Sequence, residues 1–122
     1  MLKTETRRQG SVTVLTVTGD VHSADNDAFS RAVEQLKDEA GPGTRVAVDL
    51  SGLEYLNSRA LGDLVALYMH LRGQGGEAVL AGARPGVLKV LRFTGLGELL
   101  ESFPDLAAAT GALSARAGAK PQ

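Results

Sequence analysis

The sequence predicts an α/β fold, with one mixed, mostly parallel sheet of four to five strands and about four helices. Three observations support this prediction. Runs rich in β-branched apolar residues alternate with segments in which apolar residues recur at helical spacing. Strands that alternate with helices require crossover connections, which make neighbouring strands parallel. The chain has 122 residues, which suffice for one core but not for two ordinary domains.

Local polarity patterns and chain breakers define the individual elements. Short apolar runs between glycines or prolines predict strands, and longer segments with one apolar stripe predict helices. The expected strands cover residues 2–8, 11–19, 44–52, 77–82 and 98–103, and the expected helices cover residues 25–40, 58–72, 85–93 and 105–117. The run at 44–52 is expected to be the central strand, covered on both faces.

Turns and caps separate these elements. Gln9-Gly10 is the expected hairpin turn between the first two strands, and Asp25 or Asn26 is the expected N-cap of the first helix. We expect residues 1–113 to form one domain and residues 114–122 to form a flexible C-terminal tail.

Composition excludes several functional classes. Apolar residues make up 43% of the chain and charged residues 22%, as in a soluble globular domain. The net charge is −1 and no long basic run occurs, which argues against binding to nucleic acid. The absence of cysteine suits a reducing compartment. No segment has the pattern of a signal peptide or a membrane span, so we expect a cytoplasmic protein without membrane insertion.

Motifs for catalysis or cofactor binding are weak. His22 and His70 lack a third ligand at metal spacing, so no metal site is expected. The glycine-rich segment at 73–76 joins a helix to a strand, whereas a phosphate-binding loop runs from a strand to a helix. Ser58 is not in a Gly-x-Ser-x-Gly elbow, and no acid or oxyanion donor accompanies it. We therefore expect no enzyme and no cofactor.

The central segment carries a family resemblance. It reads "VAVDLSGLEYLNSRALGDLVALYMHLRGQG", with Asp-Leu-Ser-Gly at 49–52 followed by the turn "YLNSRALG" at 55–62. Together with "RPGVLKVLRFTGLGELLESFPDLAAA" downstream, this pattern resembles the STAS domain, and within it the single-domain anti-sigma factor antagonists, also called anti-anti-sigma factors. The resemblance covers about residues 3–113 and implies the SpoIIAA-like version of the predicted fold.

The resemblance implies a regulator that acts by switching partners. Such a protein binds an anti-sigma factor that is also a serine protein kinase, and so regulates transcription indirectly; the kinase phosphorylates the antagonist and a serine phosphatase reverses the reaction. Ser58 matches the phosphorylated serine. The residues implied in partner binding are Gly19, Asp20, His22, Ser23, Tyr55, Asn57, Ser58, Arg59 and Gly62. The chain departs from the family pattern at His22 and Asn57, where aspartate is usual, and at Arg59, where a small residue is usual.

Other interpretations of these residues remain open. Ser and Asn are preferred helix caps, so Ser58 is expected to cap the following helix as well as to be modified. The alternative function is a STAS scaffold or accessory subunit of a sensor complex or transporter, which binds a partner without phosphorylation. Leu61, Phe93 and Phe103 are assigned to the core, whereas Tyr55 is left open between core and contact surface. The expected oligomeric state is a monomer or a weak dimer through an edge strand.

Overall fold

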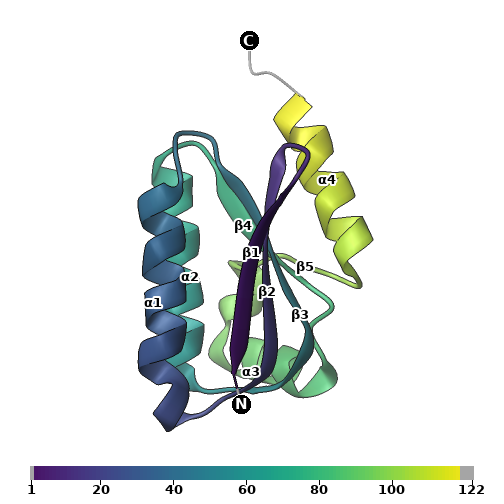
Figure 1. Cartoon of the computed structure of the whole chain (residues 1–122). Helices are drawn as coiled ribbons and strands as arrows, with labels where there is room; N and C mark the ends of the chain where they lie inside the picture. The colour runs from purple at the N-terminus through teal and green to yellow at the C-terminus, as the bar shows by residue number, and fades with distance from the viewer. Residues whose placement is uncertain (1, 119–122) are drawn as a thin grey trace.

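The computed structural model describes residues 2–118 and contains one five-stranded sheet and four α-helices. The elements in chain order are β1 (Lys3–Gln9), β2 (Val12–Val21), a 3₁₀ turn (Ser23–Asp25), α1 (Asn26–Glu39), β3 (Arg45–Leu56), α2 (Ser58–Gly73), β4 (Glu77–Ala81), α3 (Pro85–Thr94), a second 3₁₀ turn (Leu96–Glu98), β5 (Ser102–Phe103) and α4 (Leu106–Gly118). The strand order is β1-β2-β3-β4-β5, antiparallel between β1 and β2 and parallel elsewhere. The predicted fold class and the central position of the third strand are confirmed (Figure 1).

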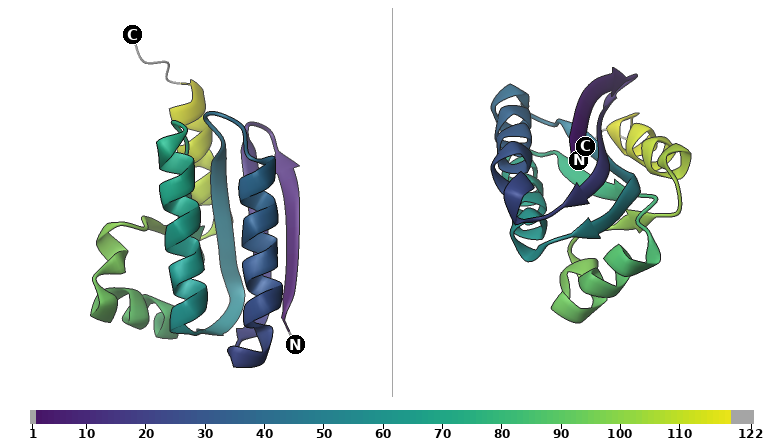
Figure 2. Two further views of the ribbon diagram at one scale, coloured as in Figure 1. Left: turned by 90° about the vertical axis from the view of Figure 1, so that its left-hand side faces the viewer. Right: turned by 60° about the horizontal axis from the view of Figure 1, so that its bottom comes forward.

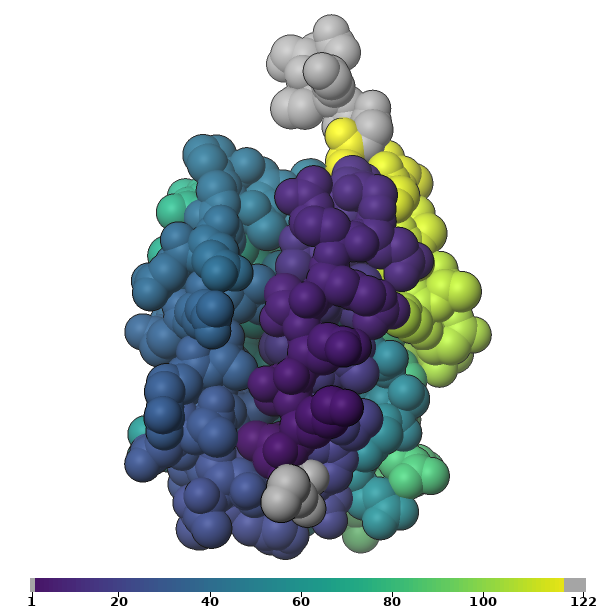
Figure 3. Space-filling model, viewed as in Figure 1, coloured from purple at the N-terminus to yellow at the C-terminus, as the bar shows by residue number. Residues whose placement is uncertain are grey.

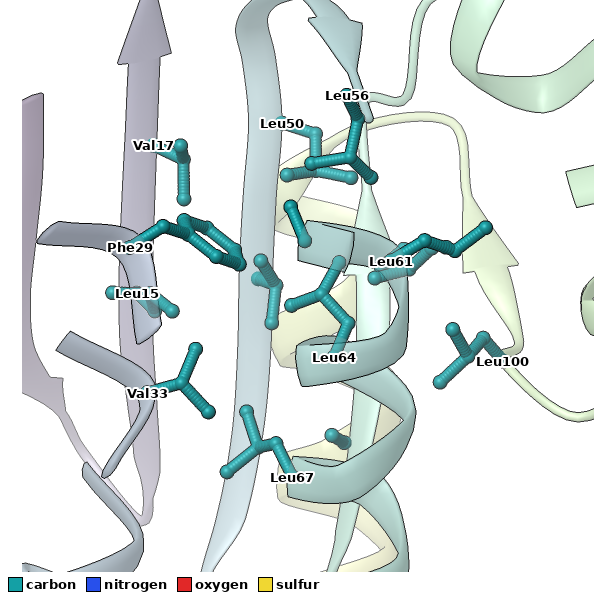
Figure 4. Close-up of a cluster of buried hydrophobic side chains, with 14 of the residues drawn as sticks. Leu15, Val17, Phe29, Val33, Leu50, Leu56, Leu61, Leu64, Leu67 and Leu100 are labelled. Carbon is teal, nitrogen blue, oxygen red and sulfur yellow. The ribbon is translucent and has the colours of Figure 1, made fainter. Parts of the chain in front are cut away.

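The sheet lies between two layers of helices. Helices α1 and α2 cover one face and α4 covers the other, while α3 lies at the end of the sheet where β3 terminates (Figure 2). On the first face, Phe29 and Val33 of α1 point toward Leu64 and Leu67 of α2, and Leu61 lies on the other side of α2 in the same core cluster, as Figure 4 shows. All five side chains are buried, and the expected core position of Leu61 is confirmed. Because β2 and β3 carry apolar side chains on both faces, the two layers bury them completely.

The hairpin between β1 and β2 turns one residue later than expected. Gln9 is the last residue of β1 and pairs with Val12, so Gly10 and Ser11 form the turn. Gly10 has a φ of 64°, and among residues 2–118 only glycines have a positive φ, so Ser11 does not. This is the pattern of a type II′ turn with glycine at its first central position. This turn suits the right-handed twist of the two strands.

The boundaries differ from expectation at three other places. The strand β3 continues to Leu56, four residues beyond the expected end at 52. The expected strand at 98–103 shrinks to two residues, because a 3₁₀ turn occupies 96–98. The last helix, expected at 105–117, ends at Gly118, so residues 114–118 do not belong to the expected tail; residues 119–122 lie outside the described part of the chain.

One core assignment is wrong. Phe93 is 81% exposed, because it lies near the end of α3 on the side opposite the buried Val87 and Leu91. Its ring packs instead beneath the ammonium group of Lys89, 5.9 Å from the ring centroid. Phe103 is half-buried against the smaller core cluster under α4, so its assignment holds in part.

The end of α4 is fastened to the sheet by charges. Arg116 forms ion pairs with Glu77 of β4 at 2.8 Å and with Glu101 at 3.0 Å. The hydrogen bond to Glu101 raises the pKa of the Arg116 guanidinium above its usual value. These contacts hold the last turns of α4 against the sheet. Within residues 2–118, no helix is both long and apolar enough to cross a bilayer.

Replacing Gly76 with alanine should destabilise the fold. A Cβ at this position would overlap the backbone carbonyl of Thr44, on the loop that leads into β3. We expect Gly76→Ala to lower the free energy of unfolding by about 2–3 kcal/mol, because backbone must move to relieve the overlap. Urea denaturation followed by circular dichroism measures this change.

Gly111→Ala is the matched control. Gly111 lies inside α4, and a Cβ there meets no atom within 4 Å. Alanine should therefore stabilise the protein by about 0.5–1 kcal/mol through its higher helix propensity. Equal unfolding midpoints for the two variants would contradict the proposed close approach at Gly76.

Candidate functional site

The predicted site residues lie where β2 and β3 end. Val21 ends β2 and Leu56 ends β3, and the two residues pair in the sheet. The 3₁₀ turn at 23–25 follows β2, and Asn57 connects β3 to α2. In an open α/β sheet, this carboxyl edge is where loops from neighbouring strands meet and where binding sites form.

Two irregularities lengthen β3 at this edge. Thr16 and Thr18 pair with Asp49 and Gly52, so β3 carries one extra residue between them. A second extra residue follows, because Gly19 pairs with Leu53 but Val21 pairs with Leu56. Bulges of this kind bend a strand, leave backbone groups without ladder partners and change the direction of side chains.

Aspartate side chains bind the backbone N–H groups that the bulges release. At the second bulge, Oδ1 of Asp20 accepts hydrogen bonds from the N–H groups of Glu54 (3.2 Å) and Tyr55 (3.1 Å). At the first, Oδ1 of Asp49 accepts bonds from the N–H (3.0 Å) and the hydroxyl (2.8 Å) of Ser51. The bulge held by Asp20 leaves two consecutive residues, Glu54 and Tyr55, exposed in front of the helix α2.

An exposed aromatic pair stands on the second bulge. The rings of His22 and Tyr55 stack with centroids 4.7 Å apart and an interplanar angle of 18°. Tyr55 is 46% exposed, which answers the open question about its position: it lies on the surface and not in the core. Nε2 of His22 is 3.8 Å from Oδ2 of Asp20, so the same carboxylate that holds the bulge also faces the imidazole.

Asn57 is the N-cap of α2, and Ser58 is not. The Asn57 side-chain oxygen accepts a hydrogen bond from the N–H of Ala60 at 2.9 Å, and its amide donates to Oδ1 of Asn26 at 2.8 Å. Its own backbone N–H donates to the carbonyl of Val21 at 3.3 Å. The expectation that Ser58 caps the helix is therefore wrong. Asn57 takes that role and also ties the start of α2 to the start of α1.

Ser58 is the first residue of α2, and its side chain is exposed. Within residues 2–118, no other group is hydrogen-bonded to its hydroxyl. Two neighbours on the same turn, Arg59 and Gly62, are exposed as well. The surface around the hydroxyl is thus open to a second protein.

The remaining site residues have backbone or peripheral positions. Gly19 has a φ of 90° and pairs with Leu53 inside the sheet, so it shapes the strand before the site. Ser23 is exposed in the 3₁₀ turn. Asp25 is the N-cap residue of α1, as expected, but its side chain makes no cap hydrogen bond, because its carboxylate accepts from the backbone N–H of His22 at 3.2 Å.

Sequence reasoning missed three residues at this edge. Asn26 is the partner of the cap residue Asn57. Glu54 and Arg84 form an exposed ion pair of 2.9 Å that connects the bulge in β3 to the start of α3. Glu54 lies in the bulged end of β3 and Arg84 in the loop after β4, and their position at the carboxyl ends of parallel strands was the available signal.

Comparisons with known proteins agree with this architecture. The protein family described as "Mlab, STAS domain" matches residues 4–101. An anti-sigma factor antagonist from Mycobacterium paratuberculosis is 25% identical, with a TM-score of 0.80 over 93% of this chain and 95% of that chain. A sulfate transporter family protein from Wolinella succinogenes is 14% identical, with a TM-score of 0.72 over 88% of each chain. No curated protein sequence matches the chain.

SpoIIAA of Bacillus, an anti-sigma factor antagonist, shares the fold in both of its forms. The unphosphorylated form is 17% identical with a TM-score of 0.67, over 84% of this chain and 87% of that chain. The phosphorylated form is 16% identical with a TM-score of 0.62, over 84% and 90%. The family match at residues 4–101 spans most of this chain, so the chain belongs to the STAS domain family. Its sheet and helices have the SpoIIAA-like arrangement.

The assignment of the cap to Asn57 can be tested by stability. Asn57→Ala removes the bonds to Ala60 and Asn26 and should lower the free energy of unfolding by about 1–2 kcal/mol. Ser58→Ala removes an exposed hydroxyl that makes no cap bond, and it should change the free energy of unfolding by less than about 0.5 kcal/mol. Chemical denaturation of both variants measures the difference. A larger loss for Ser58→Ala than for Asn57→Ala would contradict the assignment.

Proposed function

We propose that the protein is an anti-sigma factor antagonist that switches partners through phosphorylation of Ser58. The observation that carries the proposal is the exposed hydroxyl of Ser58 at the first residue of α2. The cap bond of this helix is made by the neighbouring Asn57, so the hydroxyl of Ser58 is not needed for it. A kinase would transfer the γ-phosphoryl group of ATP to Oγ of Ser58, with release of ADP and of the hydroxyl proton. No part of the fold needs to open for this reaction, because the hydroxyl is already at the surface.

The helix terminus favours a phosphate at this position. The first N–H groups of an α-helix lack intrahelical acceptors, and the helix dipole places positive potential there. The Asn57 side chain occupies the N–H of Ala60, and the N–H groups of Ser58 and Arg59 belong to the same first turn. A phosphoserine at the N-terminus is therefore compatible with an intact helix.

The same phosphate would oppose docking of a partner. It adds about −1.5 to −2 charges at pH 7, and a partner packed over Ser58 would have to desolvate them. A penalty of about 3–4 kcal/mol lowers affinity on the order of a few hundredfold. Control of binding by a kinase and a serine phosphatase then needs no conformational change in the antagonist.

The docking surface would combine the exposed residues around Ser58. The His22–Tyr55 stack supplies a rigid aromatic surface, and Arg59 supplies a cation next to the hydroxyl. Aromatic side chains and arginine are enriched at the energetic centres of interfaces. The partner is an anti-sigma factor of the serine kinase type, and the exchange takes place in the cytoplasm. The similarity to anti-sigma factor antagonists over nearly the whole chain supports this choice of partner.

A STAS scaffold or accessory subunit without phosphorylation is the alternative. Asn57 and Arg59 favour it, because the family pattern has an aspartate before the serine and a small residue after it. The fold shared with a sulfate transporter family protein also favours it. In this case the surface around Ser58 would bind one partner constantly, and the hydroxyl would have no regulatory role.

Phosphorylation in vitro tests the proposal. The full chain is incubated with ATP and an anti-sigma factor kinase encoded in the same genome, and phosphate is located by mass spectrometry. We expect phosphate on Ser58 in the wild type and none in Ser58→Ala. Binding of the kinase to Ser58→Glu, measured by calorimetry, should be weaker by about a hundredfold or more.

Ser51→Ala is the matched control for these measurements. Ser51 is also exposed near the end of β3, but its hydroxyl is bound to Asp49 at 2.8 Å. Its replacement should leave phosphorylation of Ser58 and kinase binding unchanged. Tight binding of the kinase by both wild type and Ser58→Glu, without phosphate at position 58, would refute the switch and support the scaffold.

A further inference from the structure

The strand β1 leaves one edge of the sheet unpaired. It is the terminal strand of the sheet order and is hydrogen-bonded to β2 alone. Six of its seven residues are exposed, the half-buried Thr4 being the exception. Figure 3 shows the strand uncovered on the surface, and no other element in the described residues lies over its outer side.

The hairpin determines which backbone groups of β1 point outward. A type II′ turn is closed by hydrogen bonding between the residues that flank it, here Gln9 and Val12. Hydrogen-bonded and non-bonded pairs alternate along an antiparallel ladder, so the odd-numbered residues of β1 bond to β2. The N–H and C=O groups of Thr4, Thr6 and Arg8 therefore point away from the sheet, toward the free edge.

We propose that a second copy of this chain pairs with this edge. The two β1 strands run antiparallel and meet on a two-fold axis at Thr6. In this register Thr6 bonds with the partner's Thr6, and Thr4 bonds with the partner's Arg8. All seven residues of β1 then face a residue of the partner, and the two sheets join into one continuous sheet.

Charge selects this register. Glu5 faces the partner's Arg7 in a pair without ladder bonds, where side chains approach most closely. Lys3 faces the partner's Gln9, so no like charges stand opposite each other. A two-fold axis at residue 5 or 7 would place Glu5 opposite itself or Arg7 opposite itself, and both arrangements are repulsive. An axis at Thr4 pairs Lys3 with Glu5 but leaves Arg7, Arg8 and Gln9 without partners.

The surroundings of β1 leave the edge accessible. Thr4 faces α1 across two surface hollows of about 220 and 280 Å³, which Ala32 and Gln35 also line, and Thr6 lines the smaller one. Helix α1 thus does not close over the strand. Arg7 already donates one hydrogen bond to the Thr16 hydroxyl at 3.2 Å, and the guanidinium has further donors for the partner's carboxylate.

The pairing leaves the Ser58 surface free. Ser58 follows β3, which is separated from β1 by β2 in the sheet. A dimer would therefore present two Ser58 surfaces to a partner. This inference is independent of whether Ser58 is phosphorylated, because its test measures self-association alone.

Sedimentation velocity of the full chain tests the pairing over a series from about 5 to about 500 μM, since a single strand pair is a small interface. We expect concentration-dependent dimers. Glu5→Arg and Arg7→Glu should each weaken self-association by more than about tenfold, because each places like charges opposite across the axis. The double variant Glu5→Arg/Arg7→Glu should restore it to within about threefold of wild type, because the swapped charges attract again.

Two further variants test the backbone and the register. Thr6→Pro should abolish the dimer but keep the monomer folded, because its N–H has no partner in its own sheet. Lys3→Glu, the matched charge reversal, faces a neutral residue and should change self-association by less than about threefold. Thermal unfolding confirms that each variant is folded. A monomeric wild type, a folded double variant that stays monomeric, or dimers of Thr6→Pro would overturn the proposal.

Discussion

The arrangement of the site depends on one carboxylate at the end of β2. Asp20 accepts the backbone N–H groups of Glu54 and Tyr55, which a bulge in β3 has removed from the ladder. These two hydrogen bonds replace the ladder bonds that the bulge removes, and so they stabilise the continuation of the strand to Leu56. The extension carries the chain to Asn57 and so determines where α2 begins.

The contacts that hold the start of α2 are separate from the exposed hydroxyl of Ser58. Asn57 bonds to α1, to β2 and to the first turn of α2, and this network holds the helix terminus in place. The apolar stripe of α2, including Leu61 and Leu64, anchors the same helix in the core. Ser58 takes no part in either set of contacts. A chemical change at its hydroxyl therefore alters the surface that a partner meets, while the supporting structure stays as it is.

The sheet offers two kinds of surface in different directions. Its carboxyl edge presents irregular loops with an aromatic stack, an ion pair and the serine hydroxyl, which are features suited to a different protein. Its lateral edge at β1 presents regular backbone groups with alternating side chains, which suit another strand. At the opposite side, the short β5 is followed by α4, whose Arg116 holds the helix against the sheet. In the described part of the chain, β1 is thus the one lateral edge strand that is long enough for extended pairing.

The sequence by itself determined the order of strands and helices, the central strand and the core position of Leu61 in α2, because these follow from local periodicity and breakers. The tertiary structure alone decided the length of β3, the cap of α2 and the exposure of Phe93. The second bulge in β3 is held by the carboxylate of Asp20, more than thirty residues earlier in the chain. The choice of Asn57 over Ser58 as the cap depends on Asn26 and Val21, and the position of Phe93 depends on how α3 lies on the sheet. Each of these features is settled by contacts between distant segments, which local patterns do not encode.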